Sequence, residues 1–256
     1  NTILLTCQAN RFIDTSPNNF TITKAGDVSA QAFSPFGGIT SVPTSYSNYF
    51  DGTGDYLSLA SNANYAVGTG DFTIEFWAYW TVAPSAGIPG NVFYAASYGT
   101  TGTGTYLGIY ITSTNINLAR YNTADDLASS ATQSVGSWNH YAITRSSGTA
   151  RIFKNGVLLA SGTVNTNYTQ SGLTIGGQSG QGHTGGYISN FRFINGTALY
   201  TSAFTPSTTP LTAISGTVLL TCQSNRFVDN SSNGLAITAT GTPSVQRFSP
   251  FNPTAP

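Results

Sequence analysis

One segment of the sequence occurs twice, near the two ends of the chain. Residues 2–36 align with residues 217–251 without a gap, and 21 of the 35 aligned positions are identical. Identity of that extent is not expected by chance, so we treat the two segments as copies of one repeat. The copies bracket a single central region. We therefore predict three parts, namely an N-terminal flank over residues 1–43, a central domain over 44–210 and a C-terminal flank over 211–256.

The repeat has two interpretations. In the first, the chain is one period of a tandem array, and each copy is a linker between domains. In the second, a single protein has duplicated ends that pack side by side. Cys7 and Cys222 occupy equivalent places in the copies, and packed ends would allow them to form a disulfide. In an array, each would be a small buried residue of a separate linker. The sequence leaves open whether the flanks form a subdomain or add strands to the central domain.

The central region has the pattern of short β-strands. The run Asp71–Trp80 alternates with a period of two and is substantially apolar on both faces, as expected inside a two-layer sandwich. Asn155-Gly156, between the runs RIFK and VLLA, favours the type I′ turn of a β-hairpin. Because no stretch of ten residues shows a convincing helical period, we predict an all-β, two-sheet antiparallel sandwich or jelly roll. Further strands are predicted at Tyr46–Asp51, Asp55–Ala60, Trp138–Arg145, Ala150–Lys154, Leu173–Ile175 and Gly186–Ile194.

Charged side chains are scarce, and this restricts the partners. They make up 7% of the chain, against roughly 25% in an average soluble domain, so the surface must be covered by uncharged polar residues. Nine basic and nine acidic residues cancel, which leaves no electrostatic footprint for phosphate backbones or anionic lipid. No apolar run approaches the length of a membrane span. We predict that neither nucleic acid nor a membrane is a partner.

Five segments of the central region carry a family resemblance. They are, in order, YFDGTGDYLSL, GTGDFTIEFWAYW, SWNHYAITRSSGTARIFKNGVLLASG, LTIGG and GGYISNFRFINGTALYTSAFTP. Together they resemble the laminin-G-like, concanavalin A-like jelly roll, over about residues 44–206. The flank motif LLTCQ-x-NRF-x-D resembles linkers between such domains in phage structural and tail-fibre proteins. These resemblances imply a location on a virion surface or outside the cell, with other virion proteins or copies of the chain itself as partners.

Catalytic chemistry is poorly represented. Hydrolysis of a glycoside needs two carboxyl groups flanking the bond, and this chain has a single glutamate, Glu75. Asp125 and Asp126 are adjacent, so on a strand they point to opposite faces. No G-x-S-x-G nucleophile elbow is present. We predict that the chain has no catalytic residues and is not an enzyme.

The resemblance implies two kinds of site. Many laminin-G-like domains hold Ca²⁺ at a sandwich edge through hard oxygen ligands. Asp51 and Asp55 in FDGTGD, with the amide oxygen of Asn190, are the candidate ligands here. The alternatives are that the two aspartates only make turn hydrogen bonds, and that no cofactor is bound.

A carbohydrate ligand would need aromatic platforms and polar side chains on an exposed face. Trp77 and Tyr79 share a strand face with Glu75, Tyr98 is a candidate for a neighbouring edge, and His183 lies in the Gly-rich loop SGQGHTGG. These five are the candidate ligand-binding residues. The alternative for each aromatic residue is a place in the core, and for His183 a solvated loop.

Three functional hypotheses follow. The first is a non-catalytic virion structural, fibre or decoration module that binds a host-surface glycan. The second is a secreted or cell-surface lectin or adhesin, assisted by calcium. The third, a glycoside hydrolase, is opposed by the carboxylate count.

Overall fold

The computed structural model describes residues 2–7, 12–26, 45–84, 90–95, 105–120, 124–169, 172–178 and 182–252. The chain divides into two compact units, residues 1–42 and residues 43–256, and each is described by itself. The described residues contain no α-helix. Within that part of the chain, no helix has the length and apolar character needed to cross a membrane.

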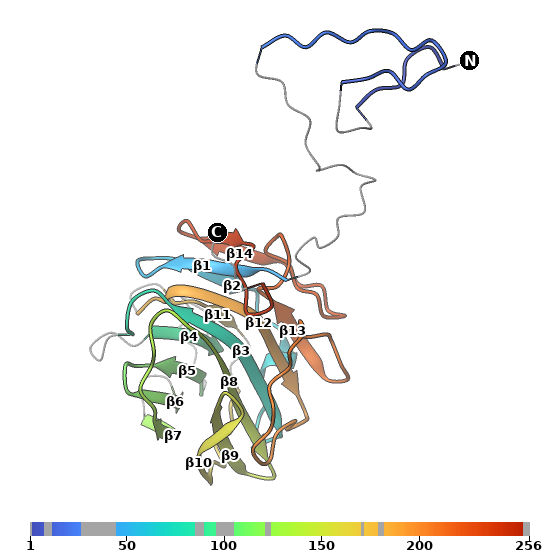
Figure 1. Cartoon of the computed structure of the whole chain (residues 1–256). Coiled ribbons are helices and arrows are strands. Elements are labelled where there is room, and N and C mark those ends of the chain that lie inside the picture. The colour runs from blue at the N-terminus through green and yellow to red at the C-terminus, as the bar shows by residue number, and fades with distance from the viewer. Residues whose placement is uncertain are drawn as a thin grey trace. The chain divides into compact units, whose positions relative to one another are not determined.

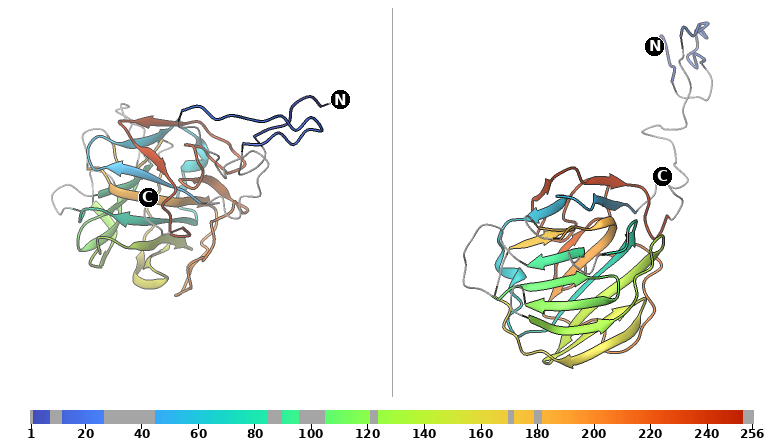
Figure 2. Two further views of the ribbon diagram at one scale, coloured as in Figure 1. Left: turned by 45° about the horizontal axis from the view of Figure 1, so that its top comes forward. Right: turned by 90° about the vertical axis from the view of Figure 1, so that its left-hand side faces the viewer.

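The larger unit is an antiparallel sandwich of two sheets, whose strands lie in separate layers (Figure 2). In the eight-stranded sheet the order is β10-β9-β8-β3-β12-β1-β15, and β13 pairs with β12 in addition. Its strands are β1 (Ser47–Asp51), β3 (Phe72–Trp80), β8 (Trp138–Ser146), β9 (Thr149–Lys154), β10 (Val157–Thr163), β12 (Gly185–Asn195), β13 (Thr217–Thr221) and β15 (Ser244–Gln246).

The seven-stranded sheet has the order β14-β2-β11-β4-β5-β6-β7. Its strands are β2 (Tyr56–Leu59), β4 (Gly90–Ala95), β5 (Leu107–Ile111), β6 (Asn115–Arg120), β7 (Ala124–Ser130), β11 (Leu173–Ile175) and β14 (Ile237–Thr240). A short 3₁₀ turn, η1, covers Ala63–Tyr65. The predicted fold class, an all-β jelly-roll sandwich, is confirmed.

The core lies between the sheets and follows from the alternation in β3. Phe72, Ile74, Phe76 and Ala78 point inward and are completely buried. The ring of Phe76 packs in parallel against aromatic rings of β8 and β12, with centroids 5.4 and 5.9 Å away. Burying a side chain of this size contributes about 1.5–3 kcal/mol. One face of β3 is thus committed to the core, and the other face is the outer surface of the eight-stranded sheet.

The strands predicted from sequence are present. The hairpin between β9 and β10 turns at Asn155 and Gly156, whose φ angles of 51° and 78° are those of a type I′ turn. Strands β5, β6 and β7 were not predicted. β7 reads ADDLASS and is mostly exposed at the edge of its sheet, so it lacks the apolar alternation on which the prediction relied.

The C-terminal flank adds strands to both sheets of the sandwich. β13 pairs with the second half of β12, β15 pairs with β1, and β14 pairs with β2 of the other sheet. Figure 1 shows this red end of the chain beside the blue β1 and β2. Val218, Leu219 and Cys222 belong to the main hydrophobic core. In this structure the C-terminal flank thus adds strands to the central domain, and residues 43–256 form one compact unit.

The N-terminal flank has no strand in its described residues, 2–7 and 12–26. It forms a loop held by the carboxylate of Asp14, which accepts hydrogen bonds from the backbone N–H groups of Leu5, Ser16 and Phe20 at 2.8–3.0 Å. Cys7 is exposed, whereas Cys222 is buried in the sandwich, and both thiols are free. The disulfide considered from the sequence is therefore not formed in this structure.

Because Leu219 is buried, its substitution tests whether the C-terminal flank contributes to the stability of the fold. Leu219→Ala should lower the free energy of unfolding by about 2–5 kcal/mol, because it removes a fully buried side chain and leaves a cavity. Val157→Ala, in which an exposed side chain of β10 is truncated, should change it by less than about 0.5 kcal/mol. Urea denaturation of both variants provides the measurement. Equal midpoints would contradict the flank's structural role.

Candidate functional site

Four aromatic residues lie in register across the outer face of the eight-stranded sheet. Tyr49 of β1 is opposite Tyr187 of β12, which is opposite Tyr79 of β3, which is opposite Trp138 of β8. The centroids of successive rings are 4.9, 5.8 and 5.7 Å apart. We call these four residues the aromatic ladder.

The position of the ladder follows from the period of the strands. Tyr49 and Tyr187 alternate with Phe50 and Ile188, which are completely buried in the core. The ladder side chains must therefore point to the opposite face. All four are partly buried, so part of each ladder residue remains exposed to solvent.

Phe248, which follows β15 in the C-terminal flank, packs on the ladder. Its ring centroid lies 4.8 Å from that of Tyr79, 5.0 Å from Tyr187 and 5.2 Å from Trp138. The carbonyl oxygen of Phe248 accepts a hydrogen bond from the hydroxyl of Ser47 at 2.5 Å. Partial burial, and then the neighbouring phenols of Tyr49 and Tyr79, raise the pKa of Tyr187, so it remains a neutral hydrogen-bond donor at physiological pH.

The same outer face is covered farther along the strands. Trp77 and Glu75 of β3 point outward like Tyr79, but they are 5% and 0% exposed. Phe251 packs edge-on against Trp77 with ring centroids 5.1 Å apart. Tyr200, in the segment after β12, donates its hydroxyl to Glu75 at 2.9 Å. Because both side chains are covered, a ligand bound on this surface would not reach them, and we do not retain Trp77 and Glu75 among the ligand contacts.

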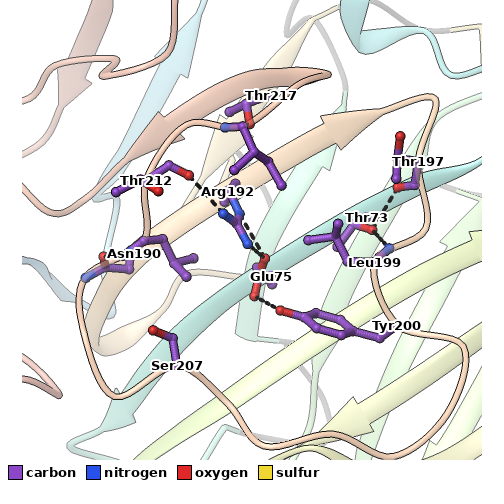
Figure 3. Close-up of polar contacts among 12 residues, drawn as sticks. Thr73, Glu75, Asn190, Arg192, Thr197, Leu199, Tyr200, Ser207, Thr212 and Thr217 are labelled. Atoms are coloured by element: carbon purple, nitrogen blue, oxygen red, sulfur yellow. Dashed lines mark hydrogen bonds and ion pairs between the residues drawn. The ribbon is translucent and has the colours of Figure 1, made fainter.

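Glu75 is the centre of a buried polar network (Figure 3). Its Oε1 accepts hydrogen bonds from Nε and an Nη of Arg192, at 2.9 and 2.5 Å. Its Oε2 lies 3.2 Å from Nε2 of His140, and Arg192 also donates to the carbonyl oxygen of Thr212 at 2.8 Å. Figure 3 shows Arg192 between β3 and the segment that carries Thr212.

Two opposing effects determine the charge of Glu75. Burial would raise the pKa of this carboxyl, but the hydrogen bond from His140 and the positive charge of Arg192 outweigh it and hold the pKa below its ordinary value. The carboxylate is therefore ionised, paired and shielded from solvent. It cannot exchange a proton with a glycoside on the surface, so the only glutamate of the chain is structural.

The candidate calcium ligands are not gathered at one point. Asp51 pairs with Gly185, five residues before Asn190 along β12, which corresponds to about 16 Å at the usual strand rise. The amide oxygen of Asn190 is buried and accepts the N–H of Leu211 at 2.8 Å. Within the described residues, no group of three or more His, Cys, Asp or Glu side chains could hold a metal ion. The set of Asp51, Asp55 and Asn190 is therefore not a metal site in this structure.

The two aspartates instead stabilise turns. Asp55 is buried and accepts the backbone N–H of Asp51 at 3.1 Å and that of Thr242 at 2.6 Å. Since Thr242 belongs to the C-terminal flank, this carboxylate ties the flank to the FDGTGD turn. Asp51 accepts the N–H of Thr53 at 2.7 Å. Both carboxylates make turn hydrogen bonds, the alternative considered from the sequence, and Asp55 in addition bonds to the flank.

His183 is partly buried beside the same turn. Its ring centroid lies 6.4 Å from that of Tyr56, and burial lowers its pKa in spite of the opposing charges of Asp51 and Asp55. It lies four residues before Tyr187 of the ladder. Tyr98, the remaining candidate, lies outside the described residues. Of the residues proposed from sequence, Tyr79 belongs to the ladder and His183 lies near the same end of the sheet.

The comparisons with known proteins agree with this architecture. Residues 51–202 match the family model of the concanavalin A-like lectin/glucanases superfamily, which is more than half of the chain, and the chain belongs to this superfamily. No curated protein matches the sequence.

Solved structures similar to this chain share little sequence with it. A "putative carbohydrate binding protein" from Bacteroides ovatus has a TM-score of 0.52 at 14% identity, covering 78% of this chain and 61% of that one. Domains LG4-5 of the mouse laminin alpha1 chain give 0.45 at 15% identity, covering 63% and 47%. The IT-sialidase CBM40 of Ruminococcus gnavus, bound to alpha2,3 sialyllactose, gives 0.46 at 18% identity, covering 60% and 91%. At these identities the likeness concerns the fold alone.

The buried network predicts how the free energy of unfolding responds to substitution of Glu75. Glu75→Gln should lower the free energy of unfolding at pH 7 by about 3–5 kcal/mol, because it leaves the buried Arg192 without its counter-charge. Asp125→Asn, which alters an exposed carboxylate bonded to Tyr110, should cost less than about 1 kcal/mol. Chemical denaturation of the three proteins tests this.

The pH dependence follows with a definite sign. The pKa of Glu75 is lower in the folded chain than in the unfolded chain, so its contribution is present above about pH 4.5 and is lost as the pH falls through the folded value. The difference between the wild type and Glu75→Gln should therefore shrink in acid. A difference that stays constant from pH 7 to pH 3 would contradict the assignment.

Proposed function

We propose that this chain is a non-catalytic glycan-binding module and that the aromatic ladder, against which the buried Phe248 packs, is its binding face. The observation that carries the proposal is the register of Tyr49, Tyr187, Tyr79 and Trp138, which aligns four partly exposed aromatic residues across adjacent strands. The apolar faces of sugar rings pack against aromatic rings, and phenol groups can donate to and accept from sugar hydroxyls. A row of such rings suits an extended chain of sugars better than a single compact ligand.

Two further observations support binding rather than hydrolysis. The only glutamate is buried and paired with Arg192, away from any surface ligand. The surface is poor in charge, so affinity would come from stacking and neutral hydrogen bonds. The similar protein from Bacteroides ovatus is described as a "putative carbohydrate binding protein", which is in keeping with this proposal. A setting outside the cell or on a virion surface, as expected from the flank motif, stays a prediction.

Truncation of the ladder tests the binding face. A glycan array of the full chain identifies a ligand, and Tyr79→Ala and Trp138→Ala should then each weaken its affinity about tenfold, corresponding to about 1.4 kcal/mol. Tyr110→Ala, on the outer face of the other sheet, serves as the matched control and should leave the affinity unchanged. Titration calorimetry supplies the dissociation constants. Equal losses in all three variants, or none in the ladder variants, would remove the ladder from the proposal.

Calcium removal separates this proposal from the calcium-assisted lectin. Since Asp51, Asp55 and Asn190 do not converge, we expect EDTA to leave the affinity of the full chain for its glycan unchanged. Titrations with and without EDTA, on protein purified in the presence of calcium, provide the measurement. A large loss of affinity in EDTA, restored by added Ca²⁺, would favour the calcium-assisted alternative.

A further inference from the structure

The two repeat copies fold into the same loop. In the C-terminal copy, the carboxylate of Asp229 accepts the N–H groups of Leu220, Ser231 and Leu235 at 3.1, 2.8 and 3.0 Å. The equivalent bonds to Asp14 in the N-terminal copy involve the residues at the same alignment positions, at 3.0, 2.8 and 3.0 Å.

Other local features also coincide. Asn18 and Asn233 each donate a side-chain N–H across the loop to a backbone carbonyl, that of Ile3 or that of Val218. The cysteine of each copy adopts a left-handed backbone, with φ of 63° at Cys7 and 59° at Cys222. The N-terminal copy therefore has the local conformation of its counterpart, although the two belong to different compact units.

The two copies differ in the burial of their apolar side chains, which are covered in the C-terminal copy and exposed in the N-terminal copy. Val218, Leu219 and Leu220 are at most 7% exposed, because β13 is paired to β12 and covered on both faces. Their counterparts Ile3, Leu4 and Leu5 are 71%, 53% and 37% exposed. Phe20 is 53% exposed, whereas its counterpart Leu235 packs against the main core. A preformed loop thus presents to solvent the apolar side chains that its copy buries.

The sequence differences between the copies follow this pattern. The residues that the C-terminal copy buries most deeply, Leu219, Leu220 and Cys222, are unchanged in the N-terminal copy. Val218 is replaced by isoleucine and Leu235 by phenylalanine, which remain apolar. The charged residue Lys24 stands opposite Ala239, an exposed position of β14. The N-terminal copy therefore keeps the apolar side chains with which residues 217–241 pack on the sandwich. We call the place that residues 217–241 occupy the docking seat. The copy carries a charge at a position that faces solvent there.

We propose that residues 2–26 dock on a second domain of this same type, in the place that residues 217–241 occupy in the present one. Residues 2–6 would pair with the edge of that domain's β12, as Thr217–Thr221 pair with Phe191–Ile194 here. The partner is a laminin-G-like domain of the same type that has no C-terminal copy of its own in the docking seat. The Asp14 loop lowers the cost of docking, since the segment is already ordered before it binds.

An exchange within the full chain tests whether the N-terminal copy fits the docking seat. Residues 217–241 are rewritten with the sequence of residues 2–26, which requires ten substitutions and retains Cys222. The reaction of the two thiols with a maleimide is then measured. We expect Cys222 to react on the order of a hundredfold more slowly than the exposed Cys7, as in the unmodified chain. The matched control adds Leu219→Asp to the exchange and should make both thiols react rapidly.

A tandem fusion tests docking on a second domain. Residues 43–216 are joined directly to Thr2 of the full chain, so that residues 2–26 follow Gly216 in the register of Thr217 onward. The added segment contains no cysteine, and Cys222 reports that the downstream domain has folded. We expect Cys7 to become as slow to react as Cys222, and Leu4→Asp in the fusion to restore its fast reaction. The proposal is overturned if Cys7 remains fast in the fusion, or if Cys222 becomes fast in the exchange.

Discussion

The structure depends on the way in which the C-terminal segment closes the sandwich. Its strands join both sheets, since β13 and β15 extend the eight-stranded sheet and β14 extends the seven-stranded one. Asp229 folds the segment onto itself, and Asp55 ties it to the turn between β1 and β2. Without the segment, the second half of β12 would lose its pairing with β13, and part of the core would be exposed to water. The segment is therefore an integral layer of the domain, not a linker that follows it.

The same segment decides what the outer face of the eight-stranded sheet can do. Phe251 covers Trp77 at one part of this face, while Phe248 packs on the ladder and leaves it partly exposed. In the covered part, the charge of Glu75 is balanced by the ion pair with Arg192, and the carboxylate accepts a hydrogen bond from the hydroxyl of Tyr200. A buried pair of this kind is costly to break, because removing one partner leaves the other charge buried and unpaired. The face is thus divided into a buried region around Glu75 and Trp77 and an aromatic region that is partly exposed.

Much of the fold could be predicted from local patterns, because alternation and the Asn155-Gly156 turn act over a few residues. That Glu75, Trp77 and Tyr79 share one face could also be predicted from the period of β3. Which part of that face is buried could not be predicted, because the residues that pack on it, Phe248 and Phe251, are more than 160 positions away in the sequence. The ladder likewise depends on the register of four strands. No local signal could have brought Tyr49, Tyr187 and Trp138 to the side of Tyr79.

The central claim is that equivalent segments of the two repeat copies differ in structure: residues 217–221 form a strand of the sheet, whereas residues 2–6 lie in an exposed loop. Amide hydrogen exchange of the full chain, followed by mass spectrometry, tests it most directly. The amides of residues 217–221 should be protected as strongly as those of β12, while those of residues 2–6, apart from the Leu5 amide that is bonded to Asp14, should exchange much faster. Rapid exchange of residues 217–221, at the rate of residues 2–6, would contradict the account.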